Sequence, residues 1–499
     1  MHLKYLYLAG LIVSFAVSFV MHVDVFPREI IGMHDWRQTQ TMWNVRNFER
    51  YDNDIRSPRV SSLNGAKKNL LRLEFPIMQW GIAQVVRLTG QDVLTARVCV
   101  WLIGIAGLVG FFGLLRTMGF SPGIALAGTV LLEFSPLFYF YTVNVIPDMF
   151  ALSAGIWFLF FSFRYFRDRR WWQLLASAIA LMLSSLAKLP FAMLGIIGIV
   201  FVVAEIIRHR RITRDAVAYP LTHLVFFSAT INWYATVMPT WGSSPALYGI
   251  FGSTNTHQEN MRILYHWMEQ YIPYDLSSRP IWPFFILGAL VPVGNRLVRV
   301  NYGKYVWSLA FITLLFVILQ WNTITFVHDY YLLPLLPWLY IVVTAGLERV
   351  WRWCLLLPRW KYALALPLLI SPVVAAPVFA SELRDPRWEG YYGSFNGQVM
   401  DAYKYQRELQ AITGPDEKVI VLNDNSMQII TWLIRKRGYV FGNDALEPGW
   451  IADVVDNDDV SYLYSNTRTF EQRPDIAPLL DSLVASYGNI NVYYVGKTE

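Results

Sequence analysis

The stretch "YLYLAGLIVSFAVSFVMHVDVFPREIIGMHDWRQTQT", residues 5–41, decides the fold. Its first part, residues 5–20, is apolar and uncharged, and it follows the basic residue Lys4. No small-residue cleavage pattern comes after it, so we predict an uncleaved transmembrane helix rather than a signal peptide. The second part is polar and places an acid, Asp35, directly after that helix. The sequence therefore predicts a membrane protein with charged residues at the exit of its first span.

The composition extends this prediction to most of the chain. Of its 499 residues, 55% are hydrophobic and only 16% are charged, which departs from the usual balance of soluble proteins. The formal net charge of +6 does not indicate a nucleic-acid partner, because the basic residues lie in short loops between apolar runs. We predict a polytopic α-helical membrane protein.

Two further features concern the compartment. Cys99 lies within an apolar run and Cys354 near a basic loop, so we expect no disulfide between them. The chain contains no Asn-x-Ser/Thr glycosylation motif. These features fit a multi-pass protein of a bacterial inner (plasma) membrane.

Apolar runs of suitable length predict about eleven transmembrane helices. They lie near residues 5–23, 93–115, 122–142, 147–164, 173–187, 190–207, 216–238, 281–295, 305–321, 331–347 and 362–380.

The loops between these helices predict the orientation. Basic residues gather in alternate loops, which the positive-inside rule assigns to the cytoplasm together with the N-terminus. They are Lys4, Arg116, Arg164, Arg167, Arg169, Arg170, Arg208, Arg210, Arg211, Arg214, Arg296, Arg299, Lys304, Arg349, Arg352, Arg359 and Lys361. The other side then holds a first outer loop (24–92), a second large outer loop (239–280), a short connection (322–330) and the C-terminus. We predict that this side is periplasmic.

The composition changes after residue 380, which predicts two domains. Residues 1–380 form the transmembrane domain, and residues 381–499 form a periplasmic α/β domain in which Asp, Glu, Pro and Gly become frequent. Within the second domain the pattern predicts strands at 418–424 and 489–496 and helices at 426–438 and 477–488.

Asp35 is the first residue with candidate chemistry. A carboxylate at the boundary of water and lipid can act as a general base toward a substrate hydroxyl. Asp35 can equally cap a helix that begins at Trp36. On a helical wheel Trp36 and Trp43 share a face with Gln40 and Asn47, so this helix has no clean division into an apolar and a polar face.

Glu74 and Lys188 are the next candidates, and each has a plainer alternative. Glu74 precedes Pro76 and an apolar segment too short to span, and it could share the base role, hold a divalent metal or be an ordinary solvated acid. Lys188 lies at the outer ends of two spans. A lysine at that depth can neutralise a phosphate, or its side chain can reach the outer membrane surface.

Three more outer segments carry polar residues of interest. Asp148 follows Pro147 in a tight turn, where starting a helix is the simpler role. The outer mouth of a later span carries His328, Asp329, Tyr330 and Tyr331. His257 and His266 in the second outer loop could bind a metal, although loop histidines are usually only polar residues.

Five of these segments together resemble a known family. "HDWRQTQT" (34–41), "EFPIMQW" (74–80), "LAKLP" (186–190), "IPDMFAL" (146–152) and "HDYYLLPLLP" (328–337) are similar to motifs of membrane glycosyltransferases of the GT-C fold. The similarity is to the bacterial branch related to protein O-mannosyltransferases and lipid A aminoarabinose transferases, and it covers roughly residues 1–350. Phe75 stands where aminoarabinose transferases carry a lysine, and Trp36 stands where mannosyltransferases tend to carry a second acid.

The resemblance implies an inverting transfer of a hexose or pentose from a polyprenyl-phosphate sugar to an acceptor hydroxyl on the outer face of the membrane. Asp35 and Glu74 would be catalytic, with Asp35 as the general base, and Arg37 and Lys188 would bind the donor phosphate. The acceptor would be a glycan, a lipid or a protein. The further implied site residues are His34, Gln38, Asp148, His328, Asp329, Tyr330 and Tyr331. No cofactor is certain, and a divalent metal with Asp35, Glu74, His257 and His266 as candidate ligands is left open.

Two other classes act on lipid-linked sugars. A flippase or transporter should show internal repeats and interrupted spans near the midplane of the membrane, whereas the charges here lie at the outer rim. An O-antigen polymerase or ligase is expected to centre on large late loops rich in Arg and His, not on an acid directly after the first span. The enzyme is therefore the favoured prediction.

Overall fold

A computed structural model of the chain describes residues 2–64, 69–241, 251, 253–290, 303–321, 323–324, 328–356, 358, 362–390, 393, 397, 399–442, 447–467 and 471–495. Contacts along the chain divide it into two compact units. The helical unit comprises Met1–Pro27, Leu73–Met78 and Leu94–Asp385. The α/β unit comprises Arg28–Arg72, Gln79–Val93 and Pro386–Glu499.

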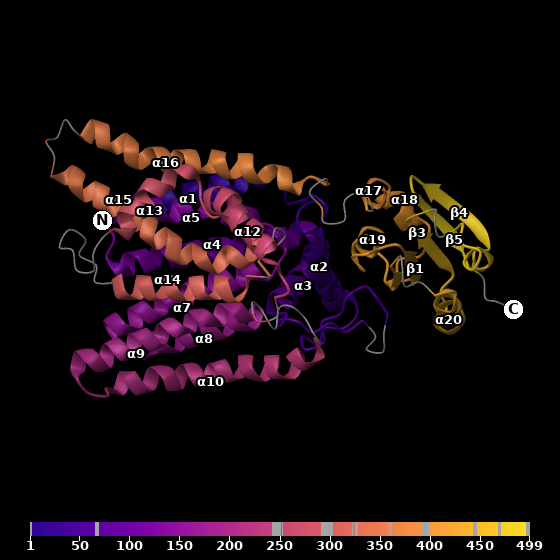
Figure 1. Cartoon of the computed structure of the whole chain (residues 1–499), viewed down its shortest axis with the longest axis horizontal. Coiled ribbons are helices and arrows are strands. Elements are labelled where there is room, and N and C mark those ends of the chain that lie inside the picture. Colours follow the sequence, from indigo (N-terminus) through magenta and orange to yellow (C-terminus); the bar gives the residue numbers. More distant parts are fainter. Residues whose placement is uncertain are drawn as a thin grey trace. The chain divides into compact units, whose positions relative to one another are not determined.

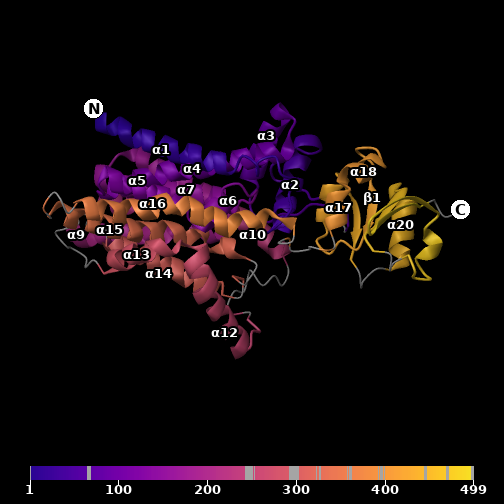
Figure 2. The same cartoon turned by 90° about the horizontal axis from the view of Figure 1, so that it is seen from above.

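The helical unit consists of apolar helices that run side by side, as α7 to α10 do in Figure 1. Its α-helices are α1 (His2–Met21), α4 (Asp92–Met118), α5 (Pro122–Glu133), α6 (Pro136–Tyr141), α7 (Asp148–Asp168), α8 (Trp171–Ala187), α9 (Ile196–His209), α10 (Arg214–Val237), α12 (His257–His266), α13 (Trp282–Ala289), α14 (Gly303–Leu319), α15 (Leu336–Leu355) and α16 (Tyr362–Arg384). Figure 2 shows α12 standing apart from the other helices of this unit. Shorter turns are the 3-10 helices η1 (Leu189–Gly195), η2 (Met238–Thr240), η5 (Arg279–Ile281) and η6 (Asp329–Leu335) and the π-helix η4 (Trp267–Asp275).

Several of these helices can cross a membrane. Within the described residues, five are long and apolar enough, and they are Asp92–Met118, Asp148–Asp168, Leu189–His209, Asp329–Leu355 and Leu366–Trp388. Four shorter apolar helices are Tyr5–Met21, Pro122–Glu133, Trp171–Ala187 and Val306–Leu319. The helices support a multi-pass membrane protein, and the total of about eleven spans stays a prediction.

Proline and serine break some of the predicted spans. The run predicted at 122–142 forms two helices, because Ser135 accepts a hydrogen bond from the Phe138 amide at 3.3 Å and Pro136 begins the new helix α6. The runs predicted at 190–207 and 331–347 each begin within a 3-10 turn that contains a proline, η1 and η6. These two turns carry Lys188 at the start of one and His328 at the start of the other.

Different groups of charged residues lie at the two ends of α7 and α8. At one end Arg169 pairs with Glu205 at 2.6 Å and with Asp215 at 2.9 Å. At the other end, where α7 begins and α8 stops, lie Asp148 and Lys188. The basic residues Arg296, Arg299, Arg359 and Lys361 lie outside the described residues, and the orientation in the membrane stays a prediction.

The α/β unit is built on a five-stranded sheet with the order β2-β1-β3-β5-β4. The strands are β1 (Val419–Leu422), β2 (Gly438–Phe441), β3 (Tyr462–Ser465), β4 (Ser482–Tyr487) and β5 (Ile490–Tyr494). β1 pairs in parallel with β2 and β3, whereas β5 is antiparallel to β3 and β4. The helices of this unit are α2 (Asp35–Arg50), α3 (Ile77–Thr89, which begins in the helical unit), η8 (Asp385–Trp388), α17 (Met400–Lys404), α18 (Gln406–Ala411), α19 (Ile429–Leu433), α20 (Pro448–Asp458) and η10 (Ala477–Leu479).

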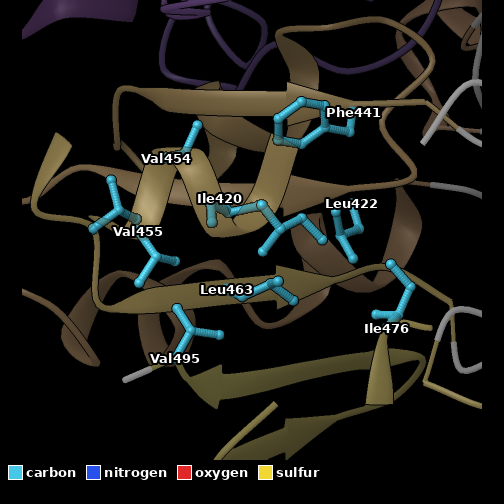
Figure 3. Packing of buried hydrophobic residues seen from close by; sticks show 10 residues of the cluster. Ile420, Leu422, Phe441, Val454, Val455, Leu463, Ile476 and Val495 are labelled. Atoms are coloured by element: carbon cyan, nitrogen blue, oxygen red, sulfur yellow. The ribbon is translucent and has the colours of Figure 1, made fainter. Parts of the chain in front are cut away.

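One face of this sheet packs against α20 in an apolar core (Figure 3). Ile420 and Leu463 of neighbouring strands face Val454 and Val455 of the helix, and all four side chains are buried. Burial of side chains of this size supplies about 1.5–3 kcal/mol each. This core holds the C-terminal part of the unit together.

The predicted strands at 418–424 and 489–496 are confirmed by β1 and β5. The helix predicted at 426–438 is much shorter, since only α19 is helical and Gly438 already begins β2. The helix predicted at 477–488 is wrong, because 482–487 forms strand β4. Gly488, with a φ of 60°, and Asn489 make the tight turn of a hairpin that pairs β4 with β5.

The first outer loop contributes to the same unit as the C-terminal strands. The Trp43 ring of α2 meets the Trp432 ring of α19 edge-on, with centroids 5.8 Å apart. The backbones of Ser61 and Leu63 bond to Gly438 at 3.2 and 2.8 Å. Segments far apart in the sequence therefore form one compact body.

Candidate functional site

The turn that leads into α2 fixes the place of Asp35. Gly32 has a φ of 95° and His34, which precedes the helix, has a φ of 62°, both in the left-handed region. The Met33 amide donates to the Arg387 carbonyl at 2.8 Å. A side chain at position 32 would place its Cβ 2.4 Å from that carbonyl oxygen, so glycine is required there.

Asp35 is the first residue of α2 and is almost fully buried, at 1% exposed. Its carboxylate accepts a hydrogen bond from the Trp36 amide at 2.7 Å. The helix therefore begins one residue earlier than predicted, with His34 and not Asp35 in the capping position. Negative charge is favoured at a helix N-terminus, so the role at the helix start and a catalytic role are compatible.

A second glycine lies against the same carboxylate. A Cβ built on Gly393 would lie 2.5 Å from Asp35 Oδ2, which is closer than real atoms approach. The Gly393 amide donates to the Gly390 carbonyl at 3.0 Å, which holds the backbone in place. Glycine at this position lets the backbone pass directly over the acid.

The other predicted residues of α2 are buried within the α/β unit. Gln38 donates to the Met33 carbonyl at 3.2 Å, and the Arg37 guanidinium bonds to the Gln40 side chain. Further along the helix, burial lowers the pKa of the Arg46 guanidinium to about 10, and Arg46 lies 3.7 Å from Asp92. Thirteen of the sixteen residues of α2 are buried, which agrees with its lack of a clean polar face.

In the helical unit the structure brings four predicted residues together around Lys188. The Lys188 Nζ lies 3.4 Å from Asp148 Oδ2. It also lies 5.3 Å from the ring centroid of Tyr330 and 5.2 Å from that of Tyr331, within the range of cation–π attraction. The Lys188 side chain is only 12% exposed, so it does not reach out to the membrane surface as the plainer alternative required.

The backbone around Glu74 lies beside the end of α8. The Phe75 amide donates to the Leu186 carbonyl at 2.9 Å, two residues before Lys188. The Trp233 indole donates to the Leu73 carbonyl at 3.1 Å, and its ring meets the Phe75 ring at 5.0 Å. Glu74 is therefore carried by a segment that is anchored to both α8 and α10, and its side chain is half-buried.

His328 and Asp329 take different positions. The Tyr330 hydroxyl hydrogen bonds to His328 Nδ1 at 3.0 Å, so His328 belongs to the group around Lys188. Asp329 is fully buried and pairs with Arg384 at 3.2 Å. Arg384 also pairs with Asp275 at 3.0 Å.

The sequence alone did not single out Arg384, Asp275 or Tyr141, whose hydroxyl bonds to Asp329. Arg384 is the last residue of α16, at the predicted outer end of that span, and Asp275 ends η4 in the second predicted outer loop. A charged residue at each of these places was a detectable feature, but the partner of each could not be deduced from the pattern.

His257 and His266 begin and end α12. His266, with Arg262 and Arg279, lines a groove of about 1080 Å³ along α12 and η4. No three His, Cys, Asp or Glu side chains come together as metal ligands anywhere in the described ranges. The question of a divalent metal with Asp35, Glu74, His257 and His266 as candidate ligands stays open.

Comparison with known proteins identifies the architecture. Residues 74–234 match the family model of dolichyl-phosphate-mannose-protein mannosyltransferases. The apo crystal structure of ArnT from Cupriavidus metallidurans superposes with a TM-score of 0.64 at 15% identity, over 99% of this chain and 98% of ArnT. The chain has the GT-C fold. The predicted resemblance to this class of membrane glycosyltransferases is confirmed.

Two further structures share the GT-C fold. ArnT bound to undecaprenyl phosphate superposes with a TM-score of 0.56 at 14% identity, over 99% of this chain and 98% of ArnT. The arabinofuranosyltransferase AftD from Mycobacteria superposes with a TM-score of 0.57 at 13% identity, over 99% of this chain and 42% of AftD. No curated protein sequence matches the chain.

Proposed function

We propose that this protein transfers a sugar from a polyprenyl-phosphate donor to an acceptor hydroxyl on the outer face of the membrane, with inversion. The observation that carries the proposal is the group around Lys188. A buried cation at the outer end of membrane helices, next to two tyrosine rings, can neutralise the phosphate of a lipid carrier. The fold likeness to ArnT, which has been solved with undecaprenyl phosphate bound, points to the same class of lipid.

The chemistry assigned to Asp35 is that of a general base. The acceptor oxygen attacks the anomeric carbon while its proton passes to the Asp35 carboxylate. The bond from the anomeric carbon to the phosphate oxygen breaks, and its electron pair leaves with the phosphate. Because attack comes from the face opposite the leaving group, the configuration at the anomeric carbon is inverted.

The departing lipid phosphate needs positive charge near it. Lys188 and Arg37 are the proposed sources, because preorganised cations stabilise charge that develops in the transition state. Asp148 holds Lys188 at 3.4 Å, and an ammonium group is a hydrogen-bond donor that suits the oxygens of a phosphate. Glu74, carried beside the end of α8, is the second proposed acid of the site.

The test is the Asp35→Asn protein, which keeps the size of the side chain and removes the basic oxygen. We expect transfer to fall at least about a hundredfold, while affinity for undecaprenyl phosphate stays as in the wild type. Mass spectrometry of surface glycans, lipid A and envelope proteins measures the product in cells that express each variant. Asp24→Asn, at an exposed acid that begins the same loop, is the matched control and should leave transfer unchanged.

Two results would count against the proposal. Full glycosylation by a stably inserted Asp35→Asn protein would show that Asp35 is not the base. Full glycosylation by that variant, together with its loss in cells lacking the gene, would instead favour a flippase for lipid-linked sugars.

A further inference from the structure

A buried ion network lies at the end of the last membrane helix. The Arg384 guanidinium pairs with Asp275 Oδ1 at 3.0 Å and with Asp329 Oδ2 at 3.2 Å. The Arg384 and Asp329 side chains are 0% exposed, and the Asp275 side chain is 1% exposed. The network therefore joins three segments that are distant in sequence, namely α16, the end of η4 in the second outer loop, and η6.

The Arg384 guanidinium lies between two buried carboxylates. Two buried acids repel each other, and each would be costly to bury without a cation. Further bonds complete the network, since the Tyr141 hydroxyl donates to Asp329 and Gln270 donates to Asp275 Oδ1 at 3.4 Å. Arginine suits this place because its planar fork can bind two carboxylates at once.

Asp329 of the network is adjacent in the sequence to residues of the group around Lys188. Asp329 lies between His328 and Tyr330, whose side chains share a hydrogen bond of 3.0 Å. The Tyr330 ring also meets the ring of Tyr141 edge-on at 6.1 Å. The ion pair between Asp329 and Arg384 thus holds in place the segment that carries the two tyrosine rings beside Lys188.

We infer that Arg384 is a positioning residue for the lipid-phosphate site. By holding Asp275 and Asp329 together, it sets Tyr330 and Tyr331 against Lys188 and ties the second outer loop to that site. The inference rests on the proposed function, because it assigns Arg384 a role in binding the polyprenyl-phosphate carrier. Arg384 itself does not touch the phosphate, and its effect passes through Asp329.

A double-mutant cycle tests the inference on the purified full-length protein in nanodiscs, with undecaprenyl phosphate as the probe. The four proteins are the wild type, Arg384→Lys, Lys188→Met and the double variant. Lysine keeps the charge and loses the fork, so we expect Arg384→Lys to weaken binding about tenfold when Lys188 is present. When Lys188 is already Met, the same change should have little further effect.

A purely structural role predicts a different result. Arg384→Lys would then lower the melting temperature and weaken binding equally in both backgrounds, or leave binding unchanged, and either outcome overturns the inference. Arg352→Lys is the matched control and should leave binding unchanged. Arg352 pairs with Glu348 at 2.8 Å near the C-terminal end of α15, whereas Asp329 lies in η6 before the N-terminal end of that helix. If Arg384→Lys does not fold, Asp329→Asn replaces it in the cycle, because that change weakens the pair with Arg384 through which the effect passes.

The cycle also separates two kinds of failure. Wild-type affinity in Lys188→Met would remove Lys188 from the phosphate site and so contradict the proposed function. Weaker binding in Lys188→Met, together with additive effects of Arg384→Lys, would keep the proposed function and reject the role of Arg384.

Discussion

Asp35 shows how single residues shape the site. Two glycines, Gly32 and Gly393, bring the backbone close to the turn that carries this acid. At Gly32 the positive φ and the nearby Arg387 carbonyl both require glycine. At Gly393 the φ lies outside the left-handed region, and lack of space requires glycine, since a Cβ would lie 2.5 Å from Asp35 Oδ2 and 3.2 Å from the Gly390 carbonyl oxygen.

Gly393→Ala should therefore act on Asp35. The added methyl group would meet the carboxylate at 2.5 Å, so the acid has to move by a substantial part of an ångström. We expect a loss of transfer of about a hundredfold, because small displacements of a catalytic group are costly. Product formation measured by mass spectrometry, beside the melting temperature, checks this.

The matched control for this prediction is Gly449→Ala. Gly449 belongs to the same unit, and a Cβ there meets nothing within 4 Å. Its transfer activity should equal that of the wild type. Full activity of Gly393→Ala would show that Asp35 tolerates displacement, which does not fit a general base.

Some of these residues could be predicted from the sequence and others could not. Lys188 was predictable because a lysine at the outer end of apolar runs is costly unless it has a partner. Its actual partners, Asp148 and the two tyrosines, come from other helices that only the tertiary structure brings near. The same holds for Arg384, whose carboxylate partners lie in two other segments.

At the scale of elements, helices α13 and α15 approach each other through small residues. A Cβ on Gly288 would lie 1.9 Å from the Val342 carbonyl oxygen, and one on Gly346 would lie 1.9 Å from the Phe284 carbonyl oxygen. Small residues at membrane helix contacts allow this closeness and the van der Waals packing that comes with it.

Gly346→Ala should force these helices apart. Overpacking of this kind costs about 1–3 kcal/mol, so we expect a lower melting temperature of the detergent-solubilised protein. Gly123→Ala is the control in the same unit, because its Cβ would meet only Tyr7 at an ordinary 3.7 Å. Equal melting temperatures for the two variants would show that the close approach of α13 and α15 is not needed for stability.

The elements also show where sequence patterns mislead. Residues 477–488 contain apolar residues at helical spacing, yet 482–487 forms β4. The Gly-Asn turn at 488 and 489 allows a hairpin, and pairing with β5 outweighs the local helical preference. The outcome depended on a neighbouring strand, and the pattern within the segment could not supply that information.

At the scale of the whole molecule, the first outer loop folds with the C-terminal strands. The order of segments in the sequence does not suggest this, since Leu94–Asp385 of the helical unit separates them. The contacts that make the unit are specific. The Trp432 indole donates to Glu29 at 2.8 Å, its ring meets the Trp43 ring, and the Arg435 guanidinium lies 3.9 Å from the centroid of the Trp432 ring.

Trp432→Ala should therefore disturb α2 although it lies almost four hundred residues away from Asp35 in the sequence. Loss of a fully buried tryptophan costs about 3–5 kcal/mol, and it removes the surface on which Trp43 packs. We expect new protease cleavage within 28–72 and a parallel loss of transfer. Trp450→Ala is the control, because Trp450 is 43% exposed and stacks on Phe441 in the same unit. The opposite outcome is a Trp432→Ala protein whose C-terminal strands unfold while residues 28–72 stay protected from protease. It would show that the first outer loop folds without these strands and that they do not support Asp35.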